Sequence, residues 1–222
     1  MLKPKRKITR KEIKKDPLLE TIDSIEAKFA KNKKTYGNVA ILVVLVLIGG
    51  YIFTNKQNQN EIESKSVLGE AMVAYSNMDY QNAKFQFENI KFNFGNTSSA
   101  NISSYFLGKI AFENGDFINS SLHLNDFLKY SDDDILVCGA IKLLTEISLK
   151  NNNFEEALNN LSKSKNYNLS NSLLLDLELL KASTFLNMND SNNGKAILEK
   201  INNEKDLPLH IKQRLEELYG MI

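Results

Sequence analysis

Residues 107–124 read LGKIAFENGDFINSSLHL, and this stretch carries the pattern that decides the fold. The small residue Gly108 is followed eight positions later by the polar Asp116, next to the aromatic Phe117, and then by Leu124. This spacing predicts two antiparallel helices joined by a polar turn, with Asp116 capping the second helix. A small residue on the facing surface lets the helices approach closely, and a large residue further along fills the space beside it.

The same pattern recurs at a period of 37 residues. The second helix of each pair is predicted to begin at Tyr80, Phe117, Phe154 and Ser191, each preceded by a polar residue: Asp79, Asp116, Asn153 and Asp190. Small residues follow three positions later at Ala83, Ser120, Ala157 and Gly194, and large apolar residues seven positions later at Phe87, Leu124, Leu161 and Leu198. Nine positions before each start lie Ala71, Gly108, Thr145 and Ala182. A fixed period of this size is typical of a solenoid.

This pattern resembles the tetratricopeptide repeat (TPR), a helix pair of about 34 residues. The repeat here is three residues longer, the family's tryptophan position holds other residues, and the fourth copy is degenerate. After Pro208, Leu209, Ile211, Leu215 and Leu218 follow at helical spacing and predict a helix that caps the array. We therefore expect an all-α protein: one N-terminal transmembrane helix, then a TPR-like α-solenoid of about four helix pairs and a C-terminal capping helix.

An apolar segment precedes the repeats. Residues 36–54 carry no charge, and residues 39–53 are continuously apolar or glycine. About 20 helical residues cross a membrane, so this segment is long enough to span one. A cleaved signal peptide and a buried core helix are the alternatives, but about 35 residues precede the segment and it has no polar face. The expected domains are a basic arm at 1–35, a transmembrane helix at 36–55 and the repeats at 56–222.

Charge predicts the orientation of the span. Residues 1–35 carry 12 Lys and Arg against 5 Asp and Glu, whereas residues 55–222 carry 16 against 22. Lysine and arginine are retained on the cytoplasmic side. We therefore expect a cytoplasmic N-terminus and a repeat domain on the far side of the membrane.

The basic arm itself contains a predicted amphipathic helix. It begins at Asp16-Pro17, with the carboxylate as N-cap and proline at the first helical position. An apolar stripe follows at Leu18, Leu19, Ile22, Ile25 and Phe29. Such a helix can lie on an anionic membrane surface, or it can simply extend the transmembrane helix, and the sequence leaves both open. The arm lacks the interleaved aromatics of a nucleic-acid site, so we expect no nucleic-acid partner.

The whole plan resembles one bacterial family, the ancillary subunit of the Sec translocon. The resemblance rests on the basic arm, one span entered at Asn32-Lys33-Lys34 and left at Gly49-Gly50-Tyr51, and a TPR domain of this length. It implies a single-pass inner-membrane protein with its TPR domain in the periplasm. It also implies translocon subunits, periplasmic chaperones or unfolded chains as partners. The alternative is a structural coordinator of the envelope or of cell division that acts through TPR self-association, as a homo-oligomer.

Chemistry-bearing motifs are absent from the sequence. His123 and His210 lie far apart and lack a partner at metal-ligand spacing, and Cys138 is the only cysteine. Asp132-Asp133-Asp134 suits a solvated turn between repeats. No phosphate-binding glycine loop, nucleophile elbow or H-E-x-x-H motif occurs. We therefore expect an interaction protein that is not an enzyme and that holds no cofactor or metal.

The TPR resemblance also implies a binding groove, because the first helix of each pair lines the concave face in that family. The matching positions are Lys65, Leu68, Met72 and Tyr75 in the first copy, Ile102, Tyr105, Lys109 and Phe112 in the second, and Lys142, Glu146 and Leu149 in the third. Aromatics, methionine and charges together suit a peptide-binding surface. The alternative is that several of them pack between neighbouring helices. If Tyr105 faces the groove, alanine there should weaken a partner without unfolding the domain.

Overall fold

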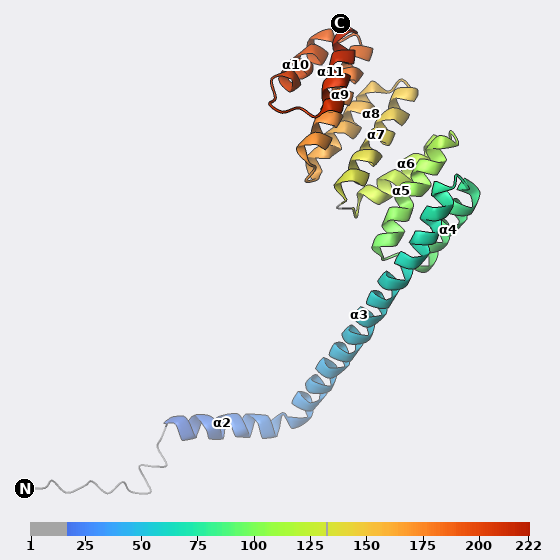
Figure 1. Cartoon of the computed structure of the whole chain (residues 1–222). Coiled ribbons are helices and arrows are strands. Elements are labelled where there is room, and N and C mark those ends of the chain that lie inside the picture. Colours follow the sequence, from blue (N-terminus) through green and yellow to red (C-terminus); the bar gives the residue numbers. More distant parts are fainter. Residues whose placement is uncertain (1–16, 132) are drawn as a thin grey trace, which may run out of the picture. The chain divides into compact units, whose positions relative to one another are not determined.

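The computed structural model describes residues 17–131 and 133–222, which form ten α-helices, one short 3-10 helix and no strand (Figure 1). The all-α prediction is confirmed. The chain divides after Lys56 into two units. The helices are α2 (Pro17–Lys31), α3 (Lys33–Ser76), α4 (Tyr80–Asn93), α5 (Ser98–Glu113), α6 (Phe117–Leu128), α7 (Asp134–Lys150), α8 (Phe154–Ser162), α9 (Asn171–Asn187), α10 (Ser191–Asn202) and α11 (Leu209–Tyr219), with the 3-10 helix η1 at Lys163–Asn166.

The N-terminal unit contains α2 and the apolar part of α3. Within the described residues, α3 alone has the length and composition to cross a membrane, and none of its apolar window is buried by protein. That exposure argues against a soluble core helix. The predicted cap Asp16 and the rest of residues 1–16 lie outside the described part of the chain.

The expected span and the first helix of the repeats lie on one continuous helix. Helix α3 runs from Lys33 to Ser76 over 44 residues, and the division between the two units after Lys56 falls within it. The physical reason is that no residue breaks it: the three prolines of the chain stand at positions 4, 17 and 208. Glycine is tolerated inside a helix at a modest cost, so Gly49-Gly50 does not end it.

The predicted starts of the second helices are confirmed. Helices α4, α6, α8 and α10 begin at the four positions that the period of 37 residues marks. Each preceding polar side chain accepts a hydrogen bond from a backbone N–H at the third residue of its helix. The O···N distances are 3.3 Å from Asp79, 3.2 Å from Asp116, 3.1 Å from Asn153 and 3.2 Å from Asp190. These caps satisfy backbone donors that the first helical turn leaves free.

The small residues lie where the two helices of a pair cross. A Cβ atom on Gly108 would come within 2.7 Å of the Leu124 side chain, so only glycine permits this approach of α5 and α6. Ser120 donates a hydrogen bond of 2.8 Å from its hydroxyl to the Gly108 carbonyl at the same crossing. Ala83, Ala157 and Gly194 are also buried at the equivalent positions.

The turns within the pairs share a backbone conformation. Met78, Gly115, Asn152 and Asn189, again spaced by 37 residues, all have a positive φ between 55° and 74°. Glycine and asparagine adopt this left-handed conformation readily, whereas a side chain such as that of Met78 does so at a cost. The turn geometry is thus set by the repeat and not by the residue type.

The hydrophobic core of the second unit falls into two clusters. The first contains buried residues from Ala71 to Leu177, and the second contains buried residues from Leu175 to Leu218. Helix α9 contributes to both. The predicted capping helix forms as α11, where Ile211, Leu215 and Leu218 are buried. Leu209 was expected in that stripe but is exposed, because it is the first residue of the helix.

Candidate functional site

The predicted groove residues lie on the first helices of three successive pairs. We call this surface the groove face and define it by Met72, Tyr75, Tyr105, Lys109, Phe112, Lys142, Glu146 and Leu149. Glu146 is exposed, Tyr105 is buried, and the other six are half-buried. Helix α5 contacts α7, and the Tyr75 ring of α3 contacts Phe106 of α5, so the groove face is continuous over the three first helices that carry it.

Tyr105 is the one residue of the groove face that is buried. Its side chain is only 8% exposed and belongs to the first core cluster. Its ring lies 5.2 Å from Phe106 and 5.4 Å from Phe127. A Cβ on Gly139 would approach the Tyr105 hydroxyl to 2.5 Å, so this glycine makes room for the tyrosine between α5 and α7. Burial raises the pKa of the Tyr105 phenol, and Lys109 offsets the effect only partly.

Tyr75 and Lys109 form an aromatic–cation pair on the groove face. The Lys109 ammonium lies 5.5 Å from the centre of the Tyr75 ring, within the range of a cation–π interaction. Burial by itself would lower the pKa of Lys109, but the hydrogen bond to Tyr75 and the nearby Tyr105 and Glu113 raise it overall. Lys109 is therefore a charged group at neutral pH. The Tyr75 ring also packs edge-on against Phe106, with ring centres 5.0 Å apart, and this contact orients the Tyr75 ring.

Phe112 and Lys150 repeat this arrangement one helix pair further along. The Lys150 ammonium lies 5.8 Å from the Phe112 ring centre and 3.6 Å from a Glu146 carboxylate oxygen. Phe112 in turn contacts Phe117 at 5.7 Å. In both places a lysine of one repeat covers an aromatic ring of the repeat before it. The groove face thus presents apolar rings bordered by charges, a composition found at protein-binding surfaces.

Lys142 has a structural partner. Its ammonium lies 2.8 Å from Asp176 Oδ2 on α9, and His210 Nε2 of α11 lies 3.9 Å from the other oxygen of that carboxylate. These three side chains connect α7, α9 and the capping helix. The charge of Lys142 is therefore paired within the protein.

A second surface was missed by the sequence prediction. On the side of α4 that faces away from the core, Phe85 and Phe92 are 69% and 88% exposed. Ile118 and Leu122 are exposed on the same side of α6. We call these four residues the outward face. The repeat period could have revealed them: 37 residues after Ile118 and Leu122 stand the polar Glu155 and Asn159, so only the first two repeats are apolar there. Large exposed apolar patches are typical of interaction surfaces, so these residues are a second candidate surface.

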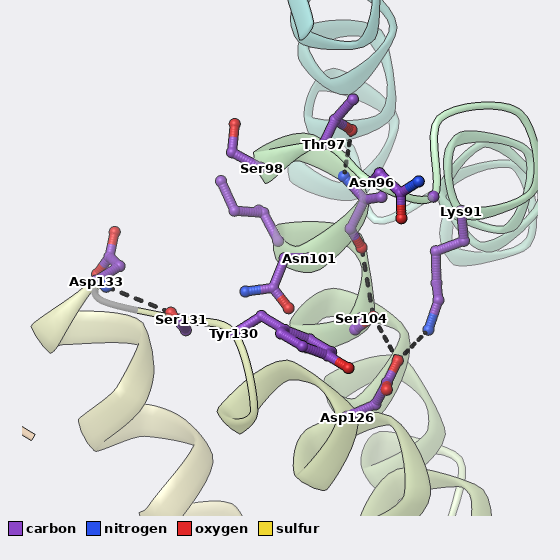
Figure 2. A pocket seen from close by; sticks show the side chains of 13 residues that line it. Lys91, Asn96, Thr97, Ser98, Asn101, Ser104, Asp126, Tyr130, Ser131 and Asp133 are labelled. Atoms are coloured by element: carbon purple, nitrogen blue, oxygen red, sulfur yellow. Dashed lines mark hydrogen bonds and ion pairs between the residues drawn. The ribbon is translucent and has the colours of Figure 1, made fainter. Parts of the chain in front are cut away.

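A polar hollow of about 750 Å³ lies where α5 begins and α6 ends, near the loops between repeats. Figure 2 shows Lys91 and Ser104 converging on Asp126 at one side of it, with Ser131 beside Asp133 at the other. The hydrogen bond from Lys91, 2.9 Å long, is the main cause that holds the pKa of Asp126 below its usual range, although burial opposes it. One side of the hollow is therefore formed by an ion pair that joins the first two repeats.

The described residues contain no side-chain cluster suited to a metal ion. No group of three or more His, Cys, Asp and Glu side chains among them could hold a metal ion. Burial lowers the pKa of His123 and raises the pKa of the Cys138 thiol, so both groups are neutral at pH 7.

Comparison with known proteins identifies the repeats. A family model described as a tetratricopeptide repeat-like domain matches residues 28–174, which is more than half of the chain. Neither the curated proteins nor the solved structures contain a significant match to this chain.

Proposed function

Because the chain belongs to the family of tetratricopeptide repeat-like domains, we propose that it is a membrane-anchored scaffold that binds other proteins at the bacterial inner membrane. We place it beside the secretion translocon and its periplasmic chaperones. Helix α3 carries the proposal, because it joins an apolar segment able to cross a membrane to the first helix of the repeats. A binding array tethered in this way holds its partners at a high local concentration beside the membrane.

The proposed topology has residues 1–35 in the cytoplasm, a span at 36–55 and residues 56–222 in the periplasm. The charge difference supports it: Lys28, Lys31, Lys33 and Lys34 precede the span closely, whereas Lys56 and Lys65 are the nearest lysines after it. A cleaved signal peptide would release the repeats from the membrane, so the two readings differ in whether the protein stays membrane-bound.

The groove face is the proposed binding surface. Tyr75, Lys109, Phe112 and Glu146 offer rings and charges to a partner, and Tyr105 supports them from the core. Rings with a charged border suit segments of translocon subunits, chaperones or unfolded chains that carry apolar side chains. The resemblance of the arm, span and repeat domain to the ancillary translocon subunit supports this choice of partners. The proposal assigns the protein no catalytic role.

Photo-crosslinking in intact cells tests the proposal. A photoreactive amino acid replaces Glu146 on the groove face, Asn159 on the outward side of α8, or Gly49 in the apolar segment. Both Glu146 and Asn159 are exposed and belong to the same repeat, so they form a matched pair. A Cβ on Gly49 meets no atom within 4 Å, so the probe fits there.

We expect adducts to chaperones, nascent chains or translocon subunits from Glu146, to translocon subunits from Gly49, and few from Asn159. Equal adducts from Glu146 and Asn159 would show that the groove face is not the binding surface. Adducts only to wall-synthesis or division proteins would contradict the proposed location beside the translocon.

A second candidate function is a structural coordinator that acts by self-association. The outward face favours it, because Phe85 and Phe92 leave two large rings exposed on one side of α4. Sedimentation of the purified full chain in detergent would detect a dimer. Replacing both phenylalanines by glutamate should dissociate it, whereas a wild-type chain that sediments as a monomer at all concentrations would exclude this candidate.

A further inference from the structure

Helix α2 has an exposed apolar stripe directly before the candidate span. Ile22, Ile25 and Phe29 are 57–60% exposed. At 100° per residue they fall on one side of the helix, and Leu18 precedes them in the sequence at the same spacing. Three large apolar side chains on one side of a 15-residue helix form a surface that water solvates poorly.

The stripe is continuous with the start of the span. Helix α2 ends at Lys31 and α3 begins at Lys33. The rings of Phe29 and Tyr36 stack across this junction, with centres 5.2 Å apart and planes at 10°. Residues seven positions apart in a straight helix are separated by about 10.5 Å along the axis, so the two rings lean together. The apolar side of α2 therefore meets the aromatic ring that stands at the entrance of the apolar segment, where such rings prefer the membrane interface.

The charges around this junction identify the kind of surface that can cover the stripe. Residues 1–35 have a net charge of +7, and no acidic residue occurs between Glu26 and Glu61. Lys28, Lys31, Lys33 and Lys34 surround the junction. Lysines close to a membrane are attracted to anionic lipid headgroups within about one Debye length, roughly 8 Å at physiological salt.

A simple extension of the transmembrane helix does not fit α2. Glu20, Asp23 and Lys31 lie on the side of α2 away from the stripe, and Glu26 and Lys28 lie at its two borders. Five charged side chains within 15 residues would be costly in the hydrocarbon core. A helix with one apolar and one charged side is instead suited to lie in the interface.

We propose that α2 binds the surface of an anionic phospholipid bilayer, with Ile22, Ile25 and Phe29 inserted at headgroup depth and the lysines of the junction bound to lipid phosphates. This inference rests on the membrane anchoring proposed above. The helix would give the chain a second membrane attachment, since the junction at Asn32 connects it directly to the span. Together the two attachments would fix the depth and the rotation of α3.

Tryptophan fluorescence of the full chain tests this directly, because the natural sequence contains no tryptophan. Three variants each carry one: Phe29→Trp on the stripe, Ala27→Trp on the opposite side of α2, and Val46→Trp in the apolar segment. Each protein is reconstituted into phosphatidylcholine vesicles with or without phosphatidylglycerol, and quenching by brominated lipid is measured. In vesicles with phosphatidylglycerol, the Phe29→Trp emission should be blue-shifted and quenched several-fold more than that of Ala27→Trp.

The variants separate the failure of this inference from the failure of the anchor. If Val46→Trp is not quenched by lipid, the anchoring itself is wrong. If Val46→Trp is quenched but Phe29→Trp behaves like Ala27→Trp, the anchor stands and α2 does not bind lipid. Equal quenching of Phe29→Trp without phosphatidylglycerol would overturn the role of anionic lipid. Changing the four junction lysines to glutamine in the Phe29→Trp chain should abolish the preference for phosphatidylglycerol.

Discussion

The two core clusters of the repeat unit are built from different side chains. The first contains a series of ring contacts that runs from Tyr75 to Phe106, then to Tyr105 and Phe127. The buried apolar residues of the second are all aliphatic: Leu175, Leu179, Ala182, Leu198, Ile201, Ile211, Leu215 and Leu218. The same repeat period positions both. The backbone geometry of a helix pair therefore does not require aromatic packing.

The difference supports the proposal that the groove face beside the first cluster is the binding surface. Rings have preferred mutual geometries, so an aromatic core fixes the orientation of its members more strictly than leucines do. The ring series ends on the groove face, where Tyr75 meets Lys109. The aliphatic cluster instead closes the end of the array with α11. Helix α9 connects the two, because Leu177 belongs to the first cluster and Leu179 to the second.

The largest expected effect is the loss of a ring from the first cluster. Phe87 is fully buried and stacks on Phe106 at 5.3 Å. Phe87→Ala should reduce the free energy of unfolding by about 3–5 kcal/mol, because it removes a buried ring and leaves a cavity. Urea unfolding of the detergent-solubilised full chain, followed by circular dichroism, measures this. Phe85→Ala, on the exposed side of the same helix, is the control and should change stability by less than about 0.5 kcal/mol.

A cavity in the second cluster should act locally. Ile211 on α11 is fully buried, and Ile211→Ala should cost about 2–5 kcal/mol of local stability. Hydrogen exchange should then accelerate in α10 and α11, while α4 to α6 keep their protection. Equal acceleration in both regions would show that the two clusters unfold as one cooperative unit. It would contradict the expected local effect of the cavity.

Gly108 and Gly194 stand at equivalent helix crossings in the two clusters. An added Cβ at Gly108 would meet Leu124, which is fully buried, whereas one at Gly194 would meet Leu186, which is half-buried. Alanine gains about 1 kcal/mol over glycine inside a helix, but overpacking costs about 1–3 kcal/mol where the neighbour cannot move. Gly108→Ala should therefore destabilise the protein, and Gly194→Ala should be neutral or slightly stabilising. Urea midpoints of the two variants in the opposite order would refute this account of the crossings.

The smallest effect concerns the ion pair between Lys91 and Asp126, which joins the first two repeats. The pKa of Asp126 is lowered in the folded protein, so its contribution exists at neutral pH and is lost as pH falls below about 3.9, the ordinary value for Asp. Solvent screening keeps this contribution below about 1 kcal/mol, because the carboxylate is partly exposed. Asp126→Asn should thus lower the urea midpoint clearly at pH 7 and less at pH 3, because the contribution is lost progressively as the pH falls below about 3.9. Glu88→Gln, in an exposed pair with Lys84, should change neither midpoint.

Local features of the repeats were predictable from the sequence, and contacts between repeats were not. The polar residue before each second helix acts through its nearest backbone donors, so its position in the sequence was sufficient. Tyr105 was assigned to the groove by its position in one repeat, but the following repeat supplies Gly139, whose missing side chain lets the ring become buried. The continuity of α3 also escaped prediction, because apolar and polar segments differ in composition without any residue that breaks the helix.

The most direct test of the central claim, that one helix joins a membrane span to a binding array on its far side, is cysteine labelling in cells. In a Cys138→Ser background, Ser24→Cys and Asn159→Cys are exposed to a membrane-impermeant maleimide after the outer membrane is permeabilised. We expect Asn159→Cys to be labelled in the membrane fraction and Ser24→Cys to react only after lysis. Labelling in the reverse order, or release of a labelled repeat domain into the soluble fraction, would contradict it.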